Sequence, residues 1–117
     1  MVDKVFVFEP DLLFSSRIES AGHKLGLDLK VAVSVSDLKE ALKESVPTML
    51  LVNLDALGVG SKSLVGLVHG ACRLVGYYSH ADSNLAKEAL AEGFDMVIPR
   101  RALVDRLSEI FAGTSSS

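Results

Sequence analysis

The stretch that decides the fold is Pro47–Gly58, which reads PTMLLVNLDALG. Its centre is an uninterrupted apolar run, with proline before it and glycine after it. A run that lacks hydrophobic alternation is typical of a parallel-sheet strand covered on both faces. Because this run ends in polar groups, it predicts a central strand that delivers Asn53 to a surface, with Asp55 two residues beyond.

The composition indicates a single α/β domain. The chain has 117 residues, of which 49% are hydrophobic and only 6% are aromatic, so its core must be built mainly from Leu, Val, Ala and Ile. We expect residues 1–112 to form the domain. Residues 113–117, which read GTSSS, form a polar tail that is either a terminus or the start of a linker.

Charge and cysteine content narrow the possible functions. A net charge of -3 with scattered basic residues argues against direct binding of nucleic acid. Cys72 is the only cysteine, which fits a reducing compartment, and we expect it to be a buried hydrophobe rather than a reactive thiol. The sequence shows no secretory signal pattern and no membrane span, so we expect a cytoplasmic protein without a membrane partner.

The chain is expected to alternate strands and helices. The pattern predicts the central strand and four others, at residues 4–8, 28–33, 73–78 and 95–98, with the second strand at a sheet edge because it alternates most. The expected helices run from Asp11 to Gly26, from Ser36 or Asp37 onward, over 63–71, from Asp82 or Ser83 to Gly93, and over 102–112. A glycine-containing loop is expected at residues 56–62.

Five strand–helix units in this length predict an open parallel sheet with helices on both faces. In such sheets the functional site lies at the carboxyl ends of the strands, near the point where the strand order reverses. That rule selects the following residues: Glu9, Pro10, Asn53, Asp55, Ser79, His80 and Arg100.

These residues, in this order, resemble the receiver domain of bacterial two-component response regulators, which is CheY-like, and the resemblance runs from Lys4 to Phe111. It implies a flavodoxin-like (βα)5 three-layer sandwich with a parallel five-stranded sheet in the order 2-1-3-4-5. It also implies a role in signal transduction and no cofactor.

The resemblance assigns family positions to particular residues. Glu9-Pro10 falls on the family's acidic pair, Asn53 on the phosphate-accepting aspartate and Ser79 on the hydroxyl position. Arg100-Arg101 falls on the family's Lys-Pro pair, and Glu92–Asp95 resembles the approach to the fifth strand. Together with Asp55, these residues outline the phosphorylation pocket of a receiver.

The departures from the family imply that this pocket is degenerate. The amide of Asn53 cannot form an acyl phosphate, because that reaction needs a carboxylate oxygen as nucleophile. Pro10 offers no ligand to a divalent ion, which leaves Glu9 as the one matched carboxylate, so we expect no metal site. Val97 stands where many receivers carry an aromatic switch residue, and the loop after Ser79 is a residue shorter than usual.

We therefore expect a phosphorylation-independent protein-interaction module that is not an enzyme. Its partner would be another signalling protein or a second copy of this chain. The candidate surface consists of Lys87, Glu88, Met96, Asp105, Arg106 and Glu109. The alternative is a sensor that binds a small anion or metabolite in the vacated pocket near Asn53, Ser79 and Arg100. A flavodoxin-like enzyme is a further rival, but no nucleophile–base pair or cofactor loop is evident.

Several individual groups leave two interpretations open. Arg100 would pair with Glu9 or Asp55, either as a conformational lock or as an ordinary ion pair. Asp55 would either accept phosphate in place of residue 53 or tie down its loop. His80 and Asp82 would be a metal or acid–base pair or, more simply, loop hydrogen-bonding groups. The segment at 58–63, GVGSKS, departs in spacing from a phosphate-binding loop, so nucleotide binding is not expected.

Overall fold

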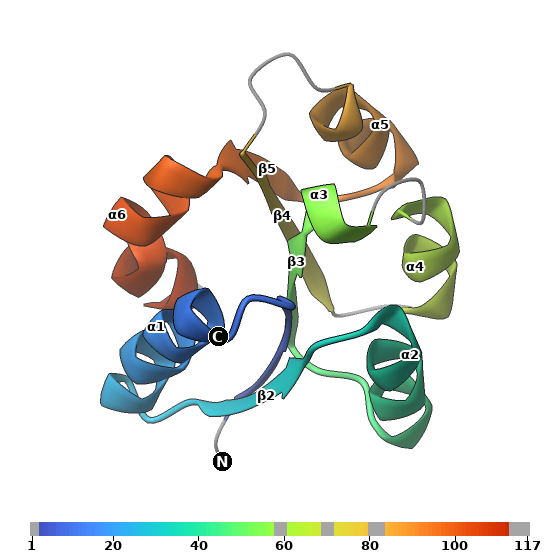
Figure 1. The fold of residues 1–117 in the computed structure, drawn as a ribbon. Coiled ribbons are helices and arrows are strands. Elements are labelled where there is room, and N and C mark those ends of the chain that lie inside the picture. The colour runs from blue at the N-terminus through green and yellow to red at the C-terminus, as the bar shows by residue number, and fades with distance from the viewer. Residues whose placement is uncertain (1–2, 58–60, 69–71, 80–83, 113–117) are drawn as a thin grey trace.

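The fold is a five-stranded, all-parallel sheet between two layers of helices (Figure 1). The computed structural model describes residues 3–57, 61–68, 72–79 and 84–112. The strands are β1 Lys4–Phe8, β2 Asp28–Ala32, β3 Met49–Asn53, β4 Arg73–Tyr78 and β5 Met96–Pro99. Their order is β2-β1-β3-β4-β5, which confirms the predicted flavodoxin-like topology.

Helices cover both faces of the sheet. They are α1 Leu12–Lys24, α2 Val35–Glu44, α3 Leu54–Leu57, α4 Ser61–Leu67, α5 Leu85–Glu92 and α6 Arg100–Ala112. Figure 1 shows α1 and α6 on one face and the other four helices on the opposite face. Within the part of the chain that the structure describes, no helix combines the length and apolar character needed to cross a bilayer.

The central strand β3 is buried as its sequence predicts. Met49 and Leu51 pack into the core cluster beneath α1 and α6, whereas Leu50 and Val52 pack into the cluster on the opposite face. All four side chains are 0% exposed. Asn53 is the first residue of the run that is only half-buried, so β3 ends by bringing a polar side chain to the rim of the sheet.

Some predicted boundaries are wrong. The segment after β3 is not simply a loop, because Leu54 and Leu57 both turn into the core and form the short helix α3. Ser34, rather than Ser36 or Asp37, caps α2 by accepting a hydrogen bond from the Asp37 backbone N–H at 3.0 Å. The last helix begins at Arg100, two residues earlier than expected, directly after β5.

Other local predictions are confirmed. Asp11 caps α1, since its Oδ1 accepts hydrogen bonds from the backbone N–H groups of Leu13 and Phe14 at 3.0 and 3.4 Å. Gly93 ends α5 with φ of 122°, a conformation that L side chains rarely adopt. The edge strand β2 alternates between exposed and half-buried positions before Ala32. The Asp11 cap thus sets where α1 begins after β1, and Gly93 sets where α5 ends before β5.

Candidate functional site

The candidate site lies at the carboxyl edge of the sheet, where the predicted residues come together. Glu9 directly follows β1, Asn53 ends β3, Ser79 directly follows β4 and Arg100 begins α6 after β5. These strands are neighbours in the sheet, so their ends meet at one rim. Pro10 is exposed beside them and has no side-chain polar atom to contribute.

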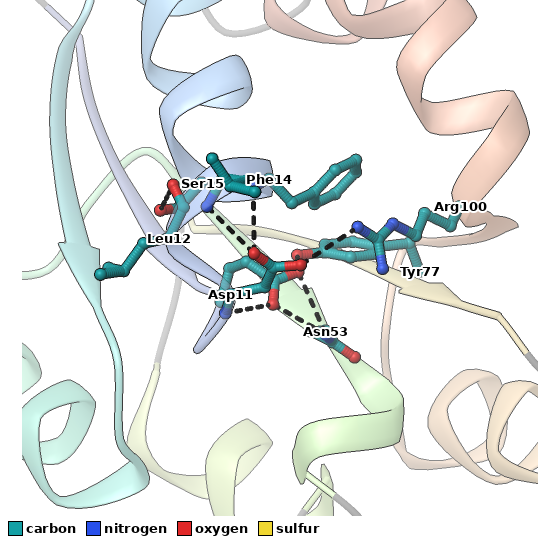
Figure 2. A network of polar contacts seen from close by, with 9 residues as sticks. Asp11, Leu12, Phe14, Ser15, Asn53, Tyr77 and Arg100 are labelled. Atoms are coloured by element: carbon teal, nitrogen blue, oxygen red, sulfur yellow. Dashed lines mark hydrogen bonds and ion pairs between the residues drawn. The ribbon is translucent and has the colours of Figure 1, made fainter.

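The centre of the site is the carboxylate of Glu9, a residue that is only 1% exposed. Asn53 Nδ2 donates to its two oxygens at 3.1 and 3.0 Å, and the hydroxyl of Tyr77 donates to Oε1 at 2.6 Å. The backbone N–H of Asp11 donates to Oε2 at 3.0 Å. Figure 2 shows Asn53, Tyr77 and Asp11 converging from three segments on this point. These hydrogen bonds offset the cost of burying the charge.

Both the nitrogen and the oxygen of the Asn53 side-chain amide form hydrogen bonds. Its nitrogen faces Glu9, and its Oδ1 accepts a hydrogen bond from the backbone N–H of Ala56 at 3.1 Å in the first turn of α3. A reversed amide would place an oxygen against the carboxylate and a donor against the Ala56 N–H. The hydrogen-bond network therefore fixes one orientation of the side chain.

Tyr77 is a site residue that the sequence interpretation missed. The sequence placed it only within the expected strand at 73–78, and its ring packs in the core, 5.6 Å from that of Phe14. The parallel register pairs it with Asn53 on β3, which is the signal that could have placed its hydroxyl at the rim. Burial, and then the hydrogen bond to Glu9, raise the pKa of Tyr77 far above its usual range, so it remains a neutral donor.

Arg100 does not pair with Glu9 or Asp55 as expected. Its Nη2 lies 3.7 Å from Oδ2 of Asp11, and its guanidinium carbon lies 3.8 Å from the centroid of the Phe14 ring. Glu9 is already enclosed by neutral donors, so the guanidinium stays outside, over the aromatic ring (Figure 2). The predicted ion pair was therefore assigned to the wrong carboxylates.

Asp55 lies in the first turn of α3 and holds the chain after β4. Its Oδ2 accepts a hydrogen bond from the backbone N–H of Ser79 at 2.6 Å, the kind of loop contact expected as one of its two roles. Its Oδ1 is buried without a hydrogen-bond partner among the described residues. The Asp55 side chain thus holds the segment after β4 and forms no hydrogen bond with Glu9 in the described structure.

The donor set does not suit the divalent ion that the resemblance to receivers implies. A cation between Glu9 and Asn53 would meet the Asn53 N–H donors and would displace hydrogen bonds that already satisfy the carboxylate. In the described ranges, no group of three or more His, Cys, Asp or Glu side chains is placed to hold a metal. Glu9 and Asn53 therefore present hydrogen-bonded groups, rather than free oxygen ligands, to an ion at this rim.

The predicted interaction surface divides into two parts. Lys87 and Glu88 are exposed on α5, and Arg106 is bonded to Glu109 on α6 at 2.9 Å. The half-buried Met96 lies on β5, at the edge of the sheet between these helices. Asp105 instead lines a hollow between α1 and α6.

Cys72 is half-buried next to β4 and carries a protonated thiol at neutral pH. Burial, and then the nearby charge of Asp95, raise its pKa to about 11. The predictions for His80, for Asp82, for a cap at Ser83 and for the glycines at 58–60 lie outside the described residues.

The comparisons with known proteins agree with this architecture. No protein-family model matches the sequence, and none of the curated proteins matches it either. Among solved structures, a response regulator from Thermotoga maritima is 17% identical, with 100% of each chain covered and a TM-score of 0.83. A CheY-like receiver domain protein from Methanospirillum hungatei is 12% identical, with 97% of each chain covered and a TM-score of 0.80.

A third similar structure is a response regulator from Burkholderia pseudomallei with a phosphorylated aspartic acid, a calcium ion and citrate. It is 15% identical, covers 97% of this chain and 73% of its own, and has a TM-score of 0.77. At these identities the similarity shows the fold alone. The chain therefore has the fold of CheY-like receiver domains, as its sequence predicts.

Proposed function

We propose that this chain is a receiver-like signalling module that binds another protein independently of phosphorylation and accepts no phosphoryl group. The observation that carries the proposal is the bonding of Glu9 and Asn53 to each other at 3.0 and 3.1 Å. In the receivers that the sequence resembles, these two positions hold the cation and accept the phosphoryl group. Here they satisfy one another, so the site is complete without either.

The chemistry of Asn53 supports this proposal. An acyl phosphate forms only on a carboxylate oxygen, and an amide offers neither the charge nor the nucleophilicity. The similar Burkholderia protein carries a phosphorylated aspartic acid and a calcium ion. Residue 53 of this chain has no comparable acceptor, and its carbonyl oxygen is already bonded to the Ala56 N–H. We infer that the fold has been kept and this modification lost.

Incubation with acetyl phosphate and magnesium, followed by intact mass measurement, tests the first half of the proposal. The expected result is no added phosphoryl mass on this chain, whereas the Burkholderia regulator serves as the positive control. Asp55→Asn is measured in parallel. A phosphoryl mass on the wild-type chain contradicts the proposal, and its loss in Asp55→Asn would identify Asp55 as the acceptor.

The surface that we propose for the partner is the α5–β5–α6 face, formed by Lys87, Glu88, Met96, Arg106 and Glu109. It combines an edge strand with two helices, and Leu90 on α5 adds an apolar side chain that is 51% exposed. Edge strands and exposed apolar side chains favour association. The partner is another signalling protein or a second copy of this chain.

No catalytic residue is part of this proposal. The Tyr77 hydroxyl and the Cys72 thiol both keep their protons at neutral pH, since the pKa of each is raised. Neither is thereby poised as a nucleophile or a base. We place the action of this module in the cytoplasm, where its free cysteine remains reduced.

A further inference from the structure

A hollow of about 700 Å³ lies on the α1 and α6 side of the site. We name it the α1–α6 hollow; its lining comes from α1, the ends of β4 and β5, and α6. The lining residues are Phe14, Arg17, Tyr78, Ser79, Pro99, Arg100, Arg101, Ala102, Val104 and Asp105. A volume of this size is in the range that small-molecule ligands occupy. Neither Glu9 nor Asn53 is part of the lining.

The charge of the α1–α6 hollow is opposite to that of the chain. Arg17, Arg100 and Arg101 line it against the single carboxylate of Asp105, although the net charge of the whole chain is -3. The first turn of α6, where two of these arginines lie, contains no acidic residue. Three guanidinium groups around one hollow favour an anionic ligand.

Arg100 is held ready for such a ligand. Its guanidinium carbon lies 3.8 Å from the centroid of Phe14, which limits the rotation of the side chain. Its carboxylate neighbour, Asp11, is 3.7 Å away, beyond hydrogen-bond distance, and both side chains are partly exposed. An incoming carboxylate or phosphate can therefore take hydrogen bonds from Arg100 without breaking a strong one.

Apart from Ser79, the remaining wall is mainly apolar and includes flat surfaces. Phe14, Tyr78 and Pro99 provide rings, and Ala102 and Val104 on α6 add aliphatic side chains. Aromatic side chains pack against flat ligand rings, and guanidinium groups also stack on aromatic faces. The α1–α6 hollow thus combines an anion-binding end with a surface for a ring.

We propose that the α1–α6 hollow binds a small aromatic anion, namely an aryl carboxylate or an aryl phosphate monoester. The anionic group contacts Arg17, Arg100 and Arg101, and the ring lies against Tyr78 and Pro99, because the ring of Phe14 is already covered by Arg100. This inference goes beyond the proposed protein-binding function. It also moves the ligand away from the pocket near Asn53 that the sequence suggested, because the amide of Asn53 is already bonded at both ends.

The test uses calorimetry and ¹⁵N-edited NMR with four probes: phenyl phosphate, benzoate, inorganic phosphate and phenol. We expect phenyl phosphate or benzoate to bind at least tenfold more tightly than inorganic phosphate or phenol. Backbone signals of Phe14, Tyr78 and Val104 should shift, while the side-chain NH2 signals of Asn53 remain in place. The two anionic probes show which head group is preferred.

Matched variants locate the binding. Arg17→Gln and Arg101→Gln change exposed residues of the lining, so they should fold normally and weaken binding of phenyl phosphate or benzoate at least tenfold. Lys39→Gln, at an exposed position on α2 that does not line the hollow, is the control and should bind as the wild type does. All three remove one positive charge, so a general charge effect would appear in each.

Three outcomes would overturn the proposal. One is the absence of binding by both phenyl phosphate and benzoate. A second is equal affinity for inorganic phosphate and phenyl phosphate, which would remove the role of the ring. The third is undiminished binding in Arg17→Gln and Arg101→Gln with loss of binding in Asn53→Ala, which would return the ligand to the strand-end pocket.

Discussion

At the scale of single residues, Glu9 determines the character of the strand-end site. A buried carboxylate is stable only when donors surround it, and here those donors are Asn53, Tyr77 and the Asp11 N–H. None of the three carries a positive charge on the donating group. The site is thus stabilised by neutral dipoles, and it differs in this respect from a pocket built to hold a cation and a phosphoryl group.

Tyr77→Phe tests this network. The variant keeps the ring but removes the 2.6 Å hydrogen bond to Glu9, leaving a buried carboxylate without one of its donors. We expect the free energy of unfolding to fall by about 1–3 kcal/mol at pH 7, measured by urea denaturation with circular dichroism. Tyr78→Phe is the control, because Tyr78 is half-buried and donates no hydrogen bond to Glu9 in the described structure. Equal stability of Tyr77→Phe and the wild type would refute the role assigned to this hydroxyl.

The same variant should change the response to alkaline pH. The folded state holds the Tyr77 proton to a higher pH than the unfolded chain, whose tyrosines ionise near pH 10. Above about pH 10 the unfolded state therefore binds fewer protons, and wild-type stability falls as the pH rises. In Tyr77→Phe this contribution is absent, so the stability gap between the two proteins should narrow from pH 9 to about pH 11. A gap that stays constant would contradict the raised pKa.

At the scale of elements, α3 holds the site together by its position against β4. Leu54 and Leu57 are buried and anchor the helix in the core. On its other side, the Ala56 N–H donates a hydrogen bond to Asn53, and Asp55 accepts one from the Ser79 N–H. Gly76 on β4 makes this possible, because a Cβ atom there would lie 2.8 Å from Cδ1 of Leu54. The absence of a side chain in β4 thus lets the short helix approach the sheet closely.

Gly76→Ala should move α3 and loosen the site. Both Cγ and Cδ1 of Leu54 lie too close to a new methyl group, at 3.0 and 2.8 Å, so this buried side chain must move, and we expect α3 to move with it. We expect a loss of about 1–3 kcal/mol in stability and a change in the Asn53 side-chain NMR signals. Gly66→Ala in α4 is the matched control, since a Cβ there meets no atom within 4 Å. It should be neutral or stabilising by up to about 1 kcal/mol. Unchanged Asn53 signals in Gly76→Ala would show that the position of α3 does not affect the site.

At the scale of the whole molecule, the α5–β5–α6 face is tested by reversing three of its charges together. We expect Lys87→Glu, Glu88→Lys and Arg106→Glu in one chain to abolish self-association in sedimentation analysis and capture of the partner. The fold should persist, because exposed ion pairs such as Arg106 with Glu109 contribute only about 0–1 kcal/mol.

A matched triple variant on α2 controls for the charge change. Lys39→Glu, Glu40→Lys and Lys43→Glu alter three exposed residues by the same total charge, on a helix packed at the other end of the sheet. This control should associate as the wild type does. If both variants behave alike, the interaction lies elsewhere or depends only on net charge.

The sequence predicts the fold more fully than the site. The run at 49–53 and the cap at Asp11 depend on local pattern, so the central strand and the start of α1 could be predicted from them, whereas the strand order came from the resemblance to receivers. Tyr77 and α3 depend on contacts across the sheet, and no local pattern contains those. Arg100 was placed at the right rim but paired with the wrong carboxylates, because burial decided that neutral groups, rather than a cation, would surround Glu9.

The hydrogen bonds to Glu9 also have a consequence for the folding pathway. They join residues 44 and 68 positions apart, from β1 to the ends of β3 and β4. Closing loops of that length carries an entropic cost that must be met before the contacts form. The site is therefore assembled only after three strands have docked in register. We expect the side-chain NH2 protons of Asn53 to become protected from exchange only at that point, which would make them a marker for the last stage of folding.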